Sequence, residues 1–303
     1  MITPAAAPLQ LISEPLLQGK QITLYLKRED LLHPQISGNK WRKLKYNLIE
    51  ARNQQKNTLL TFGGAYSNHI AAVAAAGQEY NFRTIGFIRG ESHQPLNPTL
   101  QFAQNCGMQL LYLDRTTYRQ KQDPAFQENL KKEYPDAYLL PEGGTNLLAV
   151  KGCAEIITEI NIPFDYICCA AGTGGTLAGI IARLNGHAQV LGFPALKGGQ
   201  FLTTDIEALI QEYNGQEYQN WELQTDYHFG GYAKVKPELI TFIQTFKATH
   251  HIQLEPVYTG KMLYGIYDLI RQDFFKSGCT IIAIHTGGLQ GLAGFSERFG
   301  LVF

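Results

Sequence analysis

Short apolar runs recur at regular intervals along the 303-residue chain. Eight of them are rich in β-branched or aromatic residues, and several are apolar at nearly every position. That pattern is typical of strands covered on both faces of a sheet. We therefore expect strands at 22–26, 58–62, 83–88, 108–113, 137–140, 165–171, 189–193 and 280–285.

Segments with helical spacing of apolar residues lie between most of these runs. In residues 40–52 the apolar positions are Trp41, Leu44, Leu48 and Ile49, and further helices are expected at 68–79, 146–160, 175–185 and 258–278. Strands that alternate with helices predict βαβ units and mainly parallel sheets. Eight strands with helices on both sides exceed one typical core, so the pattern predicts an α/β protein with two open, twisted sheets.

One long stretch departs from this alternation. Residues 214–235 have weak periodicity and many aromatic side chains. A segment of this length without clear elements is typical of a functional loop, and we interpret it as a loop or lid rather than core.

Composition narrows the class of partner. The chain has 26 basic and 26 acidic residues, so no charge excess favours nucleic acid or a membrane surface, and small molecules are the expected partners. Five cysteines without metal-like or paired spacing predict reduced thiols, and Cys168 and Cys169 should face opposite sides of one strand. The amino-terminal segment lacks the pattern of a signal peptide, and no apolar run is long enough for a membrane span. We expect a cytoplasmic protein without a metal site.

Three predicted strands end in glycine-rich turns that lead into helices, at 63–68, 172–176 and 285–288. The second turn consists of Gly172, Thr173, Gly174, Gly175 and Thr176. Its glycines allow backbone N–H groups to face an anion, its hydroxyls can donate, and the next helix presents its positive end. A tight packed turn would have the same appearance, but the chemistry of the loop favours a phosphate site.

The phosphate is not that of a dinucleotide. Leu177 stands where the dinucleotide motif requires a third glycine, and the next strand ends without an acidic residue. No P-loop motif occurs either. A cofactor with a single phosphate remains, and pyridoxal phosphate is the obvious candidate, since a lysine that can bind its aldehyde follows a turn in SGNKWRKL, at Lys40.

Six blocks in order extend this interpretation. They are SGNKWRKL, GGAYSNH, PEGGTN with the following KG, AAGTGGTLAG, EPVYTGK and HTGG. Together they resemble the D-cysteine desulfhydrase and 1-aminocyclopropane-1-carboxylate deaminase family, over nearly the whole chain. The resemblance implies the tryptophan-synthase-β type of pyridoxal-phosphate fold (fold type II) and a homodimer. We expect a large domain of residues 1–41 and 151–303, a small inserted domain of residues 42–150, and the active site between them.

The resemblance assigns roles to matching positions. Lys40 would bind the cofactor aldehyde and carry the Cα proton, and the neighbouring Arg42, Lys43 and Lys45 would lower its pKa. Ser67 would bind the substrate carboxylate or take part in proton transfer, although a helix N-cap is an equally good interpretation of this serine. Asn68 would bind the phenolic oxygen of the cofactor and contact the substrate.

Further roles rest on the resemblance alone. Tyr258 and Tyr232 would lie over the cofactor and bind or protonate the substrate, and His69 would contact the substrate. Thr259 and Thr286 are both candidates to contact the pyridine nitrogen, and the sequence does not choose between them.

The choice of reaction depends on Thr259. Deaminase members of the family have a glutamate at this position, which holds a proton on the cofactor ring, and a neutral hydroxyl does this less well. A weaker electron sink suits the elimination of a good leaving group, so we expect β-elimination of D-cysteine to pyruvate, ammonia and sulfide. The alternative is ring-opening deamination of 1-aminocyclopropane-1-carboxylate. Tyr66, Ala71 and Ala72 depart from the family pattern near the substrate carboxylate, which leaves a racemase or a dehydratase open. A nucleotide-dependent oxidoreductase and a non-catalytic ligand-binding descendant are more remote alternatives.

Overall fold

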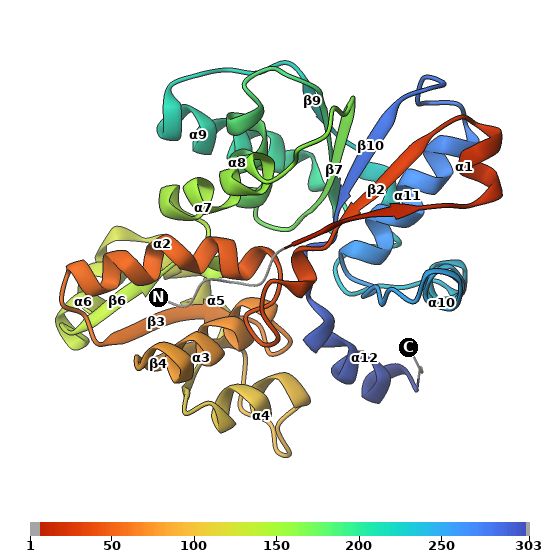
Figure 1. Ribbon diagram of the computed structural model, residues 1–303. Helices are drawn as coiled ribbons and strands as arrows, with labels where there is room; N and C mark the ends of the chain where they lie inside the picture. Colours follow the sequence, from red (N-terminus) through yellow and green to blue (C-terminus); the bar gives the residue numbers. More distant parts are fainter. Residues whose placement is uncertain (1–6, 301–303) are drawn as a thin grey trace.

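Two β-sheets organise the protein, and they are seen in the computed structural model, which describes residues 7–300 (Figure 1). The larger sheet has six strands in the order β1-β2-β10-β7-β8-β9, and only β1 runs antiparallel to its neighbour. Its strands are β1 (Leu9–Ile12), β2 (Thr23–Lys27), β7 (Tyr166–Ala171), β8 (Gln189–Pro194), β9 (Trp221–Leu223) and β10 (Thr280–Ile284).

The smaller sheet is built from the middle of the chain. Its four strands are parallel and lie in the order β5-β4-β3-β6. They are β3 (Thr58–Gly63), β4 (Arg83–Arg89), β5 (Gln109–Leu113) and β6 (Ala137–Leu140). Because the strands are parallel, the segments that follow them emerge at one edge of the sheet, where ligands bind in such folds.

Helices cover both faces of the larger sheet. One face packs against α1 (Pro15–Gly19), α10 (Pro237–His250) and α11 (Thr259–Arg271), and the other against α7 (Leu147–Thr158), α8 (Gly175–Leu184) and α9 (Leu202–Asn214). Cys168 belongs to the first of these cores and Cys169 to the second. The prediction that these two neighbours face opposite sides of a buried strand is therefore confirmed.

The smaller sheet is covered in the same way. On one face lie α2 (Asn39–Asn53), α3 (Asn68–Tyr80) and α4 (Pro98–Asn105), and on the other α5 (Arg115–Arg119) and α6 (Pro124–Glu133). Helix α12 (Leu292–Phe299) follows the last strand of the larger sheet. Among the described residues the short 3-10 helices are η1 (Glu29–Leu31), η2 (Gln120–Gln122), η3 (Glu142–Gly144), η4 (Gly199–Phe201), η5 (Thr225–His228) and η6 (Leu289–Gly291).

Helix α2 is held by a crossing with α7 and by buried charges. A Cβ atom on Gly152 of α7 would lie only 2.0 Å from the carbonyl oxygen of Arg42, so only glycine permits this approach. The buried Arg42 guanidinium donates to Glu29 at 2.8 Å and to Glu159 at 2.6 Å. The amino-terminal turn of α2 is thereby fixed between the two sheets.

The predicted α/β architecture with two sheets is confirmed, and each expected strand has a counterpart shifted by no more than a few residues. Two expectations were wrong. The helix predicted over 258–278 ends at Arg271, because the chain takes a left-handed turn at Asp273 (φ 57°). The stretch 214–235 is not simply a loop, since it contains β9, which extends the larger sheet, and η5.

Candidate active site

Lys40 lies in the first turn of α2, directly after a left-handed glycine. Gly38 has a φ of +64°, and a Cβ atom there would lie 1.9 Å from the carbonyl oxygen of Thr286. The same carbonyl accepts a hydrogen bond from the backbone N–H of Asn39 at 3.2 Å. The SGNK turn is therefore locked against the loop that follows β10.

The environment of Lys40 favours its neutral form. Burial lowers the pKa of its amine from the usual 10.5 to about 7, and the positive charge of Lys43 lowers it in the same direction. The amine donates one hydrogen bond, at 3.1 Å, to the Asn39 side chain. A lysine with a pKa near neutrality is partly deprotonated at physiological pH and is a competent nucleophile.

The basic neighbours of Lys40 differ from expectation. Arg42 is neutralised by Glu29 and Glu159, and Lys45 is paired with Glu155 at 2.6 Å. Neither contributes to the lowered pKa of Lys40, which is caused first by burial and then by Lys43. The prediction that all three cations act on Lys40 is therefore correct only for Lys43.

The glycine loop after β7 forms a cradle at the start of α8. Gly174 has a φ of +75°, and a Cβ atom on Gly175 would lie 2.8 Å from the Thr145 side chain. Backbone N–H groups at the amino end of a helix attract phosphate. The Thr176 hydroxyl accepts a hydrogen bond from the Asn39 side chain at 2.9 Å, which connects the cradle to the turn that carries Lys40.

Lys43 is a candidate cofactor-binding residue, a role that the sequence did not assign to it. Its buried amine donates to the Thr145 hydroxyl at 2.9 Å, to the Gly143 carbonyl at 3.0 Å and to the Thr173 hydroxyl at 3.3 Å. Burial lowers its pKa. The spacing of Lys40 and Lys43 by almost one helical turn was the available signal, because it places both amines on one face of α2.

The Ser-Asn turn lies at the start of α3. The Ser67 hydroxyl accepts hydrogen bonds from the backbone N–H groups of His69 at 3.2 Å and Ile70 at 3.3 Å, so the capping role is present. Asn68 accepts a hydrogen bond from the Gln290 side chain through its Oδ1 atom. Its amide Nδ2 would lie 2.8 Å from a Cβ atom on Gly288, so Asn68 and the loop after β10 are in close contact.

His69 is neutral and has an acceptor without a partner. Its Nε2 atom lies 2.9 Å from the Thr61 hydroxyl, which itself donates to the Leu140 carbonyl, so Nε2 must carry the proton. Burial, followed by the charges of Lys40 and Lys43, holds the pKa of His69 well below its usual range. Nδ1 is then a buried acceptor with no partner among residues 7–300, a feature that folded proteins rarely leave unexplained.

The two tyrosines form a pair beside the cradle. The rings of Tyr232 and Tyr258 are 6.1 Å apart and nearly perpendicular. The Tyr258 hydroxyl would lie 3.1 Å from a Cβ atom on Gly172, so this phenol borders the first glycine of the cradle. Burial, then Tyr232, raises the pKa of Tyr258, which keeps its phenol protonated. Tyr232 is 45% exposed and stands at the edge of the site.

The two candidate threonines have different surroundings. The buried Thr259 hydroxyl lies between the backbone N–H of Glu255 at 3.1 Å and the Glu255 carboxylate at 3.2 Å. That carboxylate also accepts the backbone N–H groups of Val257, Tyr258 and Thr259. The Thr286 hydroxyl has no hydrogen-bond partner within the described part of the chain, and it lies in the loop that contacts both Gly38 and Asn68.

The motifs are therefore neighbours in space. The SGNK turn contacts the cradle and the HTGG loop, the HTGG loop contacts Asn68, and the cradle contacts Tyr258. The site combines a glycine cradle, the half-buried Lys40, the buried Lys43 and an unpartnered histidine nitrogen, and these are the donors and acceptors that pyridoxal phosphate requires.

Comparisons with known proteins agree with this geometry. The model of the pyridoxal-phosphate-dependent enzyme family matches residues 2–287. A putative 1-aminocyclopropane-1-carboxylate deaminase from Pyrococcus horikoshii is 31% identical, over 91% of this chain and 87% of the relative. The bifunctional D-cysteine desulfhydrase/1-aminocyclopropane-1-carboxylate deaminase of Arabidopsis thaliana is 30% identical, over 89% of this chain and 73% of its own.

A solved structure described as an ACC deaminase homologue superimposes with a TM-score of 0.86 at 30% identity, covering 98% of this chain and 94% of its own. The range matched by the family model contains both sheets and extends into the HTGG block. The chain belongs to the pyridoxal-phosphate-dependent enzymes of fold type II, and within them to the D-cysteine desulfhydrase and 1-aminocyclopropane-1-carboxylate deaminase family.

Proposed function

We propose that this protein is a lyase that removes the thiol group of D-cysteine by β-elimination and releases pyruvate, ammonia and sulfide. The proposal rests on the half-buried Lys40 amine, whose pKa of about 7 lets it bind an aldehyde and accept a proton at physiological pH. Relatives named for this activity and for the deaminase activity support the general chemistry. When bound, pyridoxal phosphate supplies an electron sink for the bond broken at Cα.

The cofactor would be held from both ends. Gly172, Thr173, Gly174, Gly175 and Thr176 would hold its phosphate, together with the Lys43 amine. Asn68 would donate to the phenolic oxygen through Nδ2, since its Oδ1 is already paired with Gln290. We assign Thr286 to the pyridine nitrogen, because the Thr259 hydroxyl is occupied by Glu255.

The remaining side chains would handle the substrate. A carboxylate is favoured at the amino end of α3, near the Ser67 hydroxyl, by the partial positive charge of the helix. The Nδ1 atom of His69 can accept a hydrogen bond from a substrate donor. Lys40 in its neutral form takes the Cα proton, and the protonated Tyr258 phenol, with Tyr232 beside it, can donate to a leaving thiolate.

Ring opening of 1-aminocyclopropane-1-carboxylate is the second candidate, since relatives carry that name. Thr259 is the observation that separates the two. A neutral threonine stands in this position, and Glu255, the nearest carboxylate to it, uses both oxygens to accept backbone N–H groups. The family position is thus filled by a neutral hydroxyl, and the Glu255 carboxylate is engaged in holding the backbone at the start of α11, which favours elimination of a good leaving group.

The test compares both reactions on one preparation. Purified protein loaded with pyridoxal phosphate is assayed for sulfide and pyruvate from D- and L-cysteine, and for 2-oxobutanoate from the cyclopropane substrate. We expect sulfide release from D-cysteine to have the highest kcat/KM and Lys40→Ala to abolish it. Faster ring opening would assign the second function, and a protein that gains no visible absorption band with the cofactor would contradict both.

Assembly and location belong to the same proposal. We infer a cytoplasmic homodimer whose chains each divide into residues 1–41 with 151–303 and an inserted domain of residues 42–150. The unpaired state of all five cysteines supports a reducing compartment, and the position of the smaller sheet within residues 58–140 supports the division. Within residues 7–300 no helix has the length and apolar character needed to cross a bilayer. Light scattering tests the dimer, and fractionation of the source cells tests the location.

A further inference from the structure

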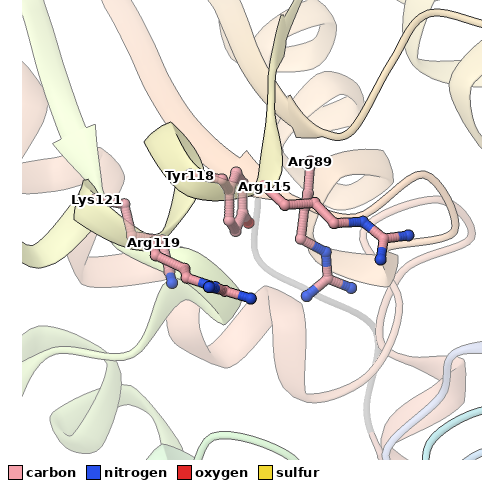
Figure 2. A pocket seen from close by; sticks show the side chains of 5 residues that line it. All are labelled: Arg89, Arg115, Tyr118, Arg119 and Lys121. Atoms are coloured by element: carbon pink, nitrogen blue, oxygen red, sulfur yellow. The ribbon is translucent and has the colours of Figure 1, made fainter.

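A basic pocket of about 400 Å³ lies at the carboxyl edge of the smaller sheet. Figure 2 shows its lining side chains gathered around one tyrosine: Arg89, Arg115, Tyr118, Arg119 and Lys121. Arg89 ends β4, while Arg115, Tyr118 and Arg119 belong to α5, which follows β5, and Lys121 lies in η2. Four cations therefore converge on one hollow in a chain whose formal net charge is zero.

Most of this charge is uncompensated. Lys121 is paired with Glu142 at 3.2 Å, and the Tyr118 hydroxyl donates to the same carboxylate at 2.8 Å. Across residues 7–300, Arg89, Arg115 and Arg119 form no ion pair with a carboxylate. Three arginines around one hollow repel each other, and their planar guanidinium groups suit a carboxylate, phosphate or sulfonate.

The pocket adjoins the candidate active site. A Cβ atom on Gly64, in the loop that leads to Ser67, would lie 3.5 Å from a guanidinium nitrogen of Arg89. On the other side, Glu142 precedes Gly143, whose carbonyl is bound by Lys43 and where a Cβ atom would lie 2.9 Å from Thr173. The lining of the pocket thus reaches the substrate loop directly through Arg89, and it reaches the phosphate cradle indirectly through Glu142, the partner of Lys121 and Tyr118.

Electrostatic interactions also connect the pocket with the candidate active site. Partial burial raises the pKa of the Tyr232 phenol, and the charges of Arg89 and Glu142 also act on it, in opposite directions. Charges that influence the phenol at the edge of the site would also influence the side chain of a bound substrate. Together with the approach of Arg89 to Gly64, this supports a pocket that acts on the part of a substrate lying toward Tyr232.

We propose that this pocket binds a second anionic group, carried on the side chain of the amino-acid substrate. The inference rests on the proposed lyase function and names its substrate class: amino acids with a phosphate, sulfonate or carboxylate beyond Cβ. For an O-phosphoserine, the Cα proton passes to Lys40, the Cβ–O bond breaks, and phosphate leaves with the bonding electrons. Uptake of one water then gives pyruvate, ammonia and inorganic phosphate.

The test measures selectivity rather than activity alone. The kcat/KM values of both enantiomers of O-phosphoserine are compared with those of O-acetylserine, in which the same Cβ–O bond breaks but the bound substrate has an uncharged acetyl group. The double variant Arg115→Gln/Arg119→Gln and the single variant Arg89→Gln are compared with Arg183→Gln, an exposed arginine at the end of α8. Thermal unfolding and the visible cofactor band confirm that each variant is folded and loaded.

We expect the wild-type protein to prefer the charged substrate and the preference to fall at least tenfold in the double variant. The preference should also fall with rising salt, while Arg183→Gln retains it. A preference that is absent, or that survives in the double variant, overturns the inference. Turnover of D-cysteine in the same experiment shows that the lyase function itself is intact.

Binding provides a readout that does not depend on turnover. Calorimetric titration of the loaded protein with O-phosphoserine should give a Kd that rises at least tenfold in the double variant, even if no 2-oxo acid is formed. Inorganic phosphate separates a substrate group from a free anion. Competition between phosphate and O-phosphoserine supports one shared subsite, whereas binding of phosphate without competition identifies an effector site and contradicts the substrate class.

Discussion

Lys43 allows the sharpest test of the phosphate cradle. Replacement by methionine keeps most of the side-chain volume and removes the amine that donates to Gly143, Thr145 and Thr173. A hydrogen bond that involves a charged group contributes about 1.5–3 kcal/mol. If Lys43 holds the cofactor phosphate, the loss of one such bond should raise the Kd for pyridoxal phosphate about 10- to 150-fold.

The same substitution should change Lys40. The charge of Lys43 is one of the causes of the lowered pKa of Lys40, so its removal should move that pKa upward from about 7. The apoprotein is titrated with pyridoxal phosphate, and the visible absorption band gives both the Kd and the rate of cofactor incorporation. In Lys43→Met the pH at which this rate is half-maximal should be higher than in the wild type.

Lys45→Met is the matched control. Lys45 lies on the same helix, but its amine is paired with Glu155 and makes no contact with the cradle. The Lys45→Met variant should bind the cofactor with nearly wild-type affinity. If Lys43→Met and Lys45→Met bind equally well and the pH profile does not move, the phosphate does not lie beside Thr173 and the assignment of the cradle is wrong.

Three further predictions concern ionisation, capping and packing. Because the folded pKa of Lys40 is lowered, the unfolded chain binds more protons than the folded chain between about pH 7 and 10.5. The free energy of unfolding of the apoprotein, measured with urea, should therefore rise with pH over this window, and less so in Lys40→Met. An equal rise with pH in both proteins would refute this. Ser67→Ala should cost about 1 kcal/mol of unfolding free energy through the lost N-cap, and Ser67→Asn should restore most of this stability without restoring activity. Gly152→Ala should destabilise the protein strongly, since its Cβ would meet the Arg42 carbonyl at 2.0 Å, whereas Gly19→Ala, with no atom within 4 Å, should have little effect on the melting temperature.

Local patterns were sufficient to predict most of the fold. Strands such as 166–171 are apolar on both faces, and the glycine turns mark the strand ends that carry the site. The edge strands β1 and β9 were missed because each is short, with only 4 and 3 residues, and is fixed by pairing with a neighbouring strand rather than by its own pattern. The stretch 214–235 is further anchored by the buried Lys261 amine, which donates to the carbonyls of His228 and Gly231.

The parts of the site that consist of adjacent residues in the sequence could be predicted. Lys40, the cradle and the Ser-Asn turn are recognisable from adjacent residues, and the structure brings them together. The partner of Thr259 was not predicted, because the Glu255 side chain turns back onto the backbone N–H groups that follow it, and no local pattern indicates such a contact. The basic pocket was not predicted from the sequence, because Arg89 and the cations of α5 are separated by 26 or more positions. They come together only because β4 and β5 are parallel neighbours in the smaller sheet.

The locked SGNK turn also has a consequence for how the cofactor would enter. Gly38, Asn39 and the Thr286 carbonyl hold this turn through the protein's own backbone, and Asn39 ties it to Thr176 of the cradle. The entropy of ordering the turn is therefore spent when the chain folds rather than when the cofactor arrives. Preorganisation of this kind makes the apoprotein a ready receptor, so that most of the binding energy would appear as affinity for the cofactor.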